Sequence, residues 1–223
     1  MSLENFEGQT WVAYSDLCGT KAIYRENPNN AAKALNRFYN EVYNLNEPAS
    51  NISSLVVSDC AIFWVDRNGS YREEGMAIEL QTLEQLLSRL NSLHKKMISE
   101  DYLIKTTISY GHFRYQNRLE MPRIRKDMII GGAYLDVYAK NDKVNAGSIV
   151  LLTEQNKEYQ NLILSDDWRW KNLCHKMLCG KEYYWCANAE RDIARIQEVQ
   201  RIRKKQERFQ KLKELYRDLT NRQ

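Results

Sequence analysis

The chain has 223 residues, of which 43% are hydrophobic and 28% charged, a composition typical of a soluble globular protein. No apolar run is long enough for a membrane span, and the acidic N-terminus lacks the basic and apolar blocks of a signal peptide, so we expect a cytoplasmic protein. The net charge of +4 is concentrated in residues 187–223, which hold 11 Lys/Arg against 6 Asp/Glu. The five cysteines are an odd number, which favours reduced thiols over a disulfide framework.

The first expected strand begins at Trp11 and ends at Gly19, and it carries Asp16 within an apolar sequence. A turn signal over residues 27–30 then precedes a helix that starts near Ala31, whose apolar residues recur at three- and four-residue steps. This spacing predicts one buried face, and a proline-containing segment over residues 46–48 ends the helix.

Residues 55–65 read as two strands or one limb of a hairpin, and they carry a second aspartate, Asp59. An amphipathic helix is expected over residues 76–97 and an alternating strand over 103–113. The elements expected after it are a basic loop (Arg118, Arg123, Arg125, Lys126), a short helix (133–140) and a strand (148–153). This interleaving predicts an α+β domain in which helices pack on one mixed sheet.

From about Ala187 the sequence contains neither glycine nor proline, and apolar residues from Ile193 to Leu219 recur on one side of a long predicted helix. Such a face needs a partner, either the rest of the chain or a second subunit; nucleic-acid binding by its basic residues is the alternative, which the interspersed acidic residues make less favourable. We divide the chain into a domain over 1–160 and a helical extension over 161–223.

The cysteines in the segment 174–186 lack the spacing of a zinc ribbon, and we expect them to be buried thiols on a helix.

Asp16 and Asp59 each lie in an apolar strand, where a carboxylate is costly to bury unless it is paired, hydrogen-bonded or bound to a cation. Two such strands predict that both carboxylates meet at one buried charge. A divalent metal is the simplest partner, because hard oxygen ligands favour Mg²⁺ or Mn²⁺ and Mg²⁺ is usually held by one or two carboxylates plus substrate phosphates. A strand-end or turn role for each aspartate is the alternative.

Four segments, 12–21, 57–60, 107–111 and 132–140, resemble the successive motifs of class III nucleotide cyclases. The resemblance implies that Asp16 and Asp59 bind metal, with the backbone carbonyl of Leu17 as a further ligand. It also implies that Gly19 and Thr20 face the nucleotide phosphates. The Ser-Asp form of the second motif and the Gly-Ala-Tyr start of the last are most similar to the pyrimidine cyclases of Pycsar anti-phage systems.

The resemblance implies a lyase in which the ribose 3′-hydroxyl attacks the α-phosphorus of a nucleoside triphosphate, with two Mg²⁺ or Mn²⁺ ions bound. It further implies a homodimer, because the metal aspartates come from one subunit and the late helix from the other. The family carries Asn and Arg on that helix, where this chain has Asp136 and Lys140. We expect Asp136 to contact the nucleotide and Lys140 to supply catalytic charge, with the basic loop at Arg123, Arg125 and Lys126 as a rival source.

Leu55 and Ile129 stand where purine cyclases of this class carry polar residues that read the base. Neither purine-reading pair is present, which favours UTP or CTP without distinguishing them; a role for both residues as strand core is equally open. The sequence therefore predicts a metal-dependent pyrimidine nucleotide cyclase that makes a cyclic second messenger in anti-phage defence. The alternatives are a catalytically silent cyclase-like domain that binds a nucleotide or a protein partner, and a nucleic-acid-binding protein.

Overall fold

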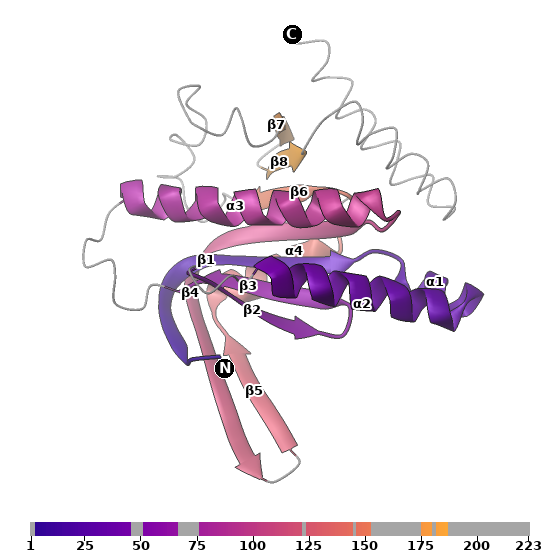
Figure 1. Cartoon of the computed structure of the whole chain (residues 1–223). Helices are drawn as coiled ribbons and strands as arrows, with labels where there is room; N and C mark the ends of the chain where they lie inside the picture. Colours follow the sequence, from indigo (N-terminus) through magenta and orange to yellow (C-terminus); the bar gives the residue numbers. More distant parts are fainter. Residues whose placement is uncertain are drawn as a thin grey trace.

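The computed structural model describes residues 3–45, 51–66, 76–121, 124–144, 146–152, 175–179 and 182–186. Its elements in chain order are β1 (Phe6–Leu17), α1 (Thr20–Glu26), α2 (Pro28–Leu45), β2 (Ile52–Val57), β3 (Cys60–Val65), α3 (Met76–Ser99), β4 (Ile104–Met121), β5 (Ile124–Ile130), α4 (Gly132–Asn141), β6 (Ile149–Leu152), β7 (His175–Cys179) and β8 (Glu182–Cys186). Helices pack on a single mixed sheet (Figure 1), which confirms the α+β class.

The strand order in the sheet is β2-β3-β1-β4-β6-β8-β7, with β5 paired to β4 off this path. β4 and β6 run parallel, whereas the other neighbours are antiparallel. β1 is bonded to β3 on one side and to β4 on the other, so its C-terminal end lies between the β2–β3 turn and the start of β4. That position brings three separate parts of the chain to one point.

The two faces of the sheet are covered by different helices. Side chains alternate between faces along a strand, so Trp11 and Ala13 of β1 join the core formed with α2 and α3, which we call the α2–α3 face. Val12 points to the opposite side and packs with Ala133 and Val137 of α4, on what we call the α4 face. Figure 1 shows α2 and α3 as the long helices beside the sheet.

The expected basic loop is wrong, because its described residues belong to strands. Arg118 lies in β4 and pairs with Lys126 of β5, and Leu119 pairs with Arg125; Arg123 lies outside the described residues. The distal parts of β4 and β5 extend away from the rest of the sheet as a two-stranded hairpin (Figure 1). Strand propensity depends strongly on context, and strand formation here is decided by the pairing partner, which the local sequence does not show.

Further departures from the expected elements occur at both ends of the chain. α1 was not expected, and α2 begins at Pro28, whose fixed φ suits the first turn of a helix. Cys179 and Cys186 lie on strands β7 and β8 rather than on a helix, because these strands extend the sheet beside β6. Both strands lie beyond residue 160, while Cys174 and the expected C-terminal helix lie outside the described residues. None of the helices in the described part of the chain combines the length and hydropathy needed to cross a bilayer.

Candidate active site

The structure brings Asp16 and Asp59 together at the end of β1. Asp16 pairs with Cys60 across the β1–β3 ladder, and the Leu17 N–H donates to the Asp59 carbonyl oxygen at 2.8 Å. Asp59 occupies the two-residue turn between β2 and β3, since Val57 and Cys60 pair on either side of it. Two carboxylates separated in sequence by two helices and a strand therefore meet at the C-terminal end of β1.

The turn that carries Asp59 has a backbone shape that antiparallel hairpins favour. Ser58 has a φ of 56°, and two-residue hairpin turns use positive φ because it matches the twist of the flanking strands. The Tyr39 hydroxyl of α2 donates to the Ser58 carbonyl at 2.7 Å, and the Cys60 thiol donates to the Val57 carbonyl at 3.1 Å. The turn is thus fixed both internally and by a helix.

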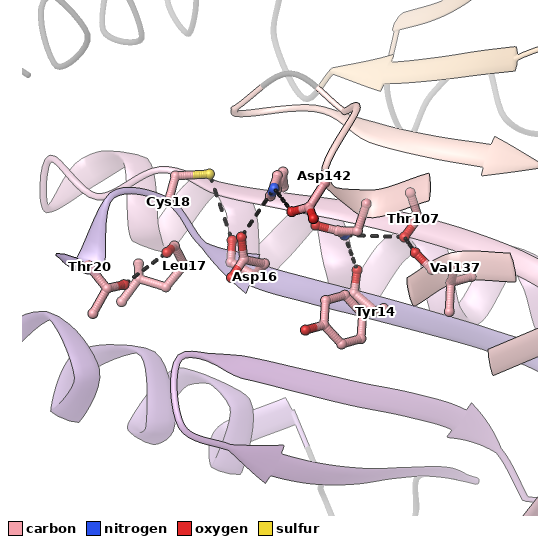
Figure 2. Close-up of polar contacts among 10 residues, drawn as sticks. Tyr14, Asp16, Leu17, Cys18, Thr20, Thr107, Val137 and Asp142 are labelled. Atoms are coloured by element: carbon pink, nitrogen blue, oxygen red, sulfur yellow. Dashed lines mark hydrogen bonds and ion pairs between the residues drawn. The ribbon is translucent and has the colours of Figure 1, made fainter. Parts of the chain in front are cut away.

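Lys105 of β4 is the cation at the centre of the site, and sequence reasoning missed it. It is the cross-strand partner of Asp16, and its Nζ lies 3.3 Å from Asp16 Oδ2 and 3.4 Å from Asp142 Oδ1. Figure 2 shows both carboxylates joined to the same ammonium by dashed lines. The Lys105 side chain is only 6% exposed. A lone lysine among the apolar and threonine residues at the start of β4 was the available signal, but only the strand register pairs it with Asp16.

The electrostatic state of Asp16 reflects competing influences. Burial raises the pKa of the Asp16 carboxyl above its ordinary range, and the Lys105 ammonium opposes that shift. The nearby carboxylates of Asp59 and Asp142 raise the pKa further, since they repel a third negative charge. The single Lys105 ammonium therefore does not neutralise the charge of the three carboxylates Asp16, Asp59 and Asp142.

The residues present fit a divalent cation. Asp16 and Asp59 offer hard carboxylate oxygens, and their mutual repulsion is the condition that a cation between them would relieve. Within the described residues no group of three or more His, Cys, Asp or Glu side chains could hold a metal by itself. Two carboxylates are the number that commonly holds Mg²⁺ when substrate phosphates complete the coordination. The site is therefore suited to a metal that binds together with an anionic substrate.

Gly19 and Thr20 form the start of α1 directly after the strand that carries Asp16. Gly19 has a φ of 82°, a conformation that glycine adopts without a Cβ penalty, and its carbonyl accepts the N–H groups of Ala22 and Ile23. The Thr20 hydroxyl donates to the Leu17 carbonyl at 2.9 Å. A carbonyl oxygen has a second lone pair, so this bond leaves Leu17 one acceptor site.

Asp136 and Lys140 lie on α4, which is fixed to β1 by the residue that follows Lys140. Asn141 Nδ2 donates to the Tyr14 carbonyl at 3.0 Å and to Thr107 Oγ1 at 3.2 Å (Figure 2). Both Asp136 and Lys140 are partly buried. Both residues therefore lie on a helix that is docked against β1. The helix is attached at Tyr14, two residues before Asp16.

Leu55 of β2 and Ile129 of β5 both pack against the apolar cluster of the α4 face, as do Tyr14 and Tyr134. All four side chains are partly buried, so they line the boundary of the cluster rather than its centre. The Tyr138 ring lies 5.7 Å from that of Tyr14 and 5.9 Å from that of Tyr134. The α4 face therefore presents an aromatic and aliphatic surface beside the carboxylates.

Comparison of the sequence with models of protein families and with curated proteins found no match. Solved structures do match over most of the chain. The adenylyl cyclase CyaB from P. aeruginosa is 16% identical, with a TM-score of 0.54 over 85% of this chain and 99% of that one. The non-canonical dimeric guanylyl cyclase domain of the RhoGC fusion protein from the fungus Blastocladiella emersonii is 11% identical, with a TM-score of 0.58 over 82% of this chain and 98% of that one. A guanylate cyclase domain from Catenaria anguillulae in complex with GTP is 12% identical, with a TM-score of 0.57 over 83% and 100%. The chain therefore has the fold of class III adenylyl and guanylyl cyclase domains.

Proposed function

We propose that this protein is a metal-dependent nucleotide cyclase that converts a pyrimidine nucleoside triphosphate to its 3′,5′-cyclic monophosphate and pyrophosphate. A fold alone does not establish an activity, so the proposal depends on the site. The observation that carries it is the meeting of Asp16 and Asp59 beside Lys105, at the C-terminal end of the central strand of a cyclase fold.

In the proposed reaction the ribose O3′ forms a bond to the α-phosphorus, and the bond from that phosphorus to the bridging oxygen of the pyrophosphate breaks. The hydroxyl proton leaves to solvent. Asp16, Asp59 and the Leu17 carbonyl would hold Mg²⁺ or Mn²⁺, which when bound acidifies the attacking hydroxyl and neutralises charge on the leaving group. Lys105, at 3.3 Å from Asp16, would place a further positive charge beside the triphosphate. Gly19 and Thr20 would face its terminal phosphates.

The proposed preference for UTP or CTP is supported by what surrounds the α4 face. Leu55 and Ile129 are apolar and pack with Tyr14 and Tyr134, so they offer no hydrogen bond to a purine edge. The polar pair with which purine cyclases of this class read the base is therefore absent, which removes the usual source of a preference for ATP or GTP. By the resemblance of its Ser-Asp turn and Gly-Ala-Tyr helix to Pycsar cyclases, we propose that the product serves as a second messenger in anti-phage defence.

We further propose that the active form is a homodimer in which Asp136 and Lys140 of one subunit complete the site of the other. Large apolar side chains are exposed on or next to α4, namely Ile130, Leu135 and Tyr138. Clustered exposed apolar residues beside a functional site are typical of a protein interface. A two-fold dimer is the commonest symmetric solution and would cover this surface while joining the two half-sites.

The primary test uses Asp16→Asn and Asp59→Asn, which remove the charge but keep the shape. Purified proteins are incubated with Mn²⁺ and each of the four ribonucleoside triphosphates, and the products are identified by mass spectrometry. We expect cyclic UMP or cyclic CMP from the wild-type protein and about a thousandfold less from either variant, as when a main electrostatic contributor is removed. The exposed Glu26→Gln is the matched control and should retain full activity.

Two outcomes would overturn the proposal. Wild-type turnover in either aspartate variant would exclude the metal role, and efficient cyclisation of ATP or GTP with UTP and CTP inert would exclude the pyrimidine preference. One alternative is a catalytically silent domain that binds the nucleotide without turnover. It is favoured by Asp136, which is an anion where the family has a neutral amide.

The proposed dimer is tested by mixing Asp59→Asn and Lys140→Ala proteins. The mixture should regain activity that neither protein has alone.

A further inference from the structure

The second carboxylate of the site is carried by an exposed turn at the edge of the sheet. β2 is the terminal strand in the strand order, so the β2–β3 hairpin has a neighbouring strand on one side only. Val57 and Ser58 at its tip are exposed, and Asp59 is partly exposed. Edge hairpins of this kind open locally more easily than central strands. The position of Asp59 relative to Asp16 therefore depends on the few contacts that hold the tip.

Two contacts join this tip to the rest of the protein through its backbone carbonyls. The Leu17 N–H of β1 donates to the Asp59 carbonyl at 2.8 Å, and the Tyr39 hydroxyl of α2 donates to the Ser58 carbonyl at 2.7 Å. The first fixes the tip along β1, while the second fixes it against a helix packed on the α2–α3 face. Because the two acceptors belong to consecutive residues, they restrain the peptide units on either side of the Asp59 Cα.

We propose that Tyr39 is a positioning residue for Asp59: its hydroxyl holds the β2–β3 turn in the orientation that places the Asp59 carboxylate beside Asp16 for metal binding. This inference rests on the metal role proposed above. The left-handed Ser58 gives the turn a backbone that a non-glycine residue occupies at a cost, so the turn gains from an external restraint. α2 supplies it, since Phe38, the neighbour of Tyr39, is fully buried and anchors the helix in the core.

The chain offers a matched control one helical turn away. Tyr43 lies four residues after Tyr39 on the same helix; Tyr43 is 80% exposed as a residue, whereas Tyr39 is 37% exposed. In the described part of the chain the Tyr43 hydroxyl makes no hydrogen bond. Replacing each tyrosine by phenylalanine removes the same hydroxyl and leaves the ring, so the pair isolates the bond to Ser58.

The first measurement tests positioning without any metal. The Leu17 amide donates to the Asp59 carbonyl, so its hydrogen exchange, followed by NMR in metal-free protein, reports how often the tip leaves β1. We expect exchange about fivefold faster in Tyr39→Phe, the change that the loss of one typical hydrogen bond produces, and no change in Tyr43→Phe. Amides of the neighbouring ladder, such as that of Val12, should exchange as in the wild type.

The second measurement is the dissociation constant of Mn²⁺ alone, from the electron paramagnetic resonance signal of free Mn²⁺. We expect about tenfold weaker binding in Tyr39→Phe, the lower end of the loss seen when a group that orients a metal ligand is removed. Equal Leu17 exchange and equal Mn²⁺ affinity in the wild type and Tyr39→Phe would overturn the inference. If the wild type binds no Mn²⁺ even when a nucleoside triphosphate is present, while Leu17 exchange still accelerates, the metal proposal fails and the role of Tyr39 in holding the turn stands.

Discussion

Lys105→Met separates the structural role of the internal ammonium from the role of a bound metal. The variant removes the cation 3.3 Å from Asp16 and leaves an apolar side chain of similar length. Breaking a buried ion pair by removing one partner costs about 3–5 kcal/mol, because the other charge stays buried. The Asp16 side chain is 25% exposed, so water recovers part of that cost and we expect about 2 kcal/mol for the metal-free protein.

For a domain of this length, a loss of 2 kcal/mol corresponds to a fall in Tm of about 4–8 °C. Calorimetry of the metal-free protein at pH 7.5 measures it, with the exposed Lys143→Met as a control that should stay within about 0.5 kcal/mol of the wild type. The difference in Tm between Lys105→Met and the wild type should become smaller as the pH is lowered. The pKa of Asp16 is already raised in the folded state, and removal of Lys105 raises it further, so the carboxyl takes up a proton as the pH falls and no longer needs a partner.

Addition of Mn²⁺ provides the decisive comparison. In the wild type the ammonium and the metal compete for the same carboxylate, whereas in Lys105→Met the metal meets no competitor. Saturating Mn²⁺ should therefore raise the Tm of Lys105→Met by more than it raises that of the wild type. An unchanged metal-free Tm, or equal Mn²⁺ shifts in the two proteins, would refute this account of the charge balance around Asp16.

Two further predictions concern the scaffold. Burial lowers the pKa of His94 to about 3, while the unfolded state keeps its ordinary value near 6.5, so stability is complete above pH 6.5 and should be lost by about 1.4 kcal/mol per pH unit as the pH falls toward 3. In His94→Gln, the free energy of unfolding measured with urea should not show this loss at low pH. If the free energies of unfolding of the variant and the wild type fall in parallel with pH, the prediction is wrong. Gly131 has a φ of 141°, and a Cβ there would overlap the His112 carbonyl, so Gly131→Ala should destabilise the protein by more than about 3 kcal/mol. Gly132→Ala, where a Cβ meets nothing within 4 Å, should match or exceed the wild type in thermal unfolding; similar losses in both would show the argument to be wrong.

Much of the fold could be predicted because it is encoded in local periodicity. The apolar residues of α2 and α3 recur with the helical repeat, and Phe38, Val42 and the leucines of α3 are indeed buried. The two aspartates could be singled out because a carboxylate in an apolar strand is unusual wherever the strand lies. These inferences need only neighbouring residues, and a sequence shows its neighbours directly.

The contacts that make the site depend on pairing between distant segments. Lys105 meets Asp16 through the register of β1 with β4, and Tyr39 meets Ser58 because α2 packs beside the β2–β3 turn. The β4–β5 hairpin and strands β7 and β8 likewise form through ladders whose partners lie elsewhere in the chain. A shift of one residue in any such register would turn every side chain of the strand to the other face. The sequence by itself therefore determined the periodic helices and singled out the two aspartates. The ion pair of Lys105 with Asp16 and the bond from Tyr39 to the turn of Asp59 were decided only by the tertiary structure, because register is fixed by the burial of a whole strand and not by the residues of the site.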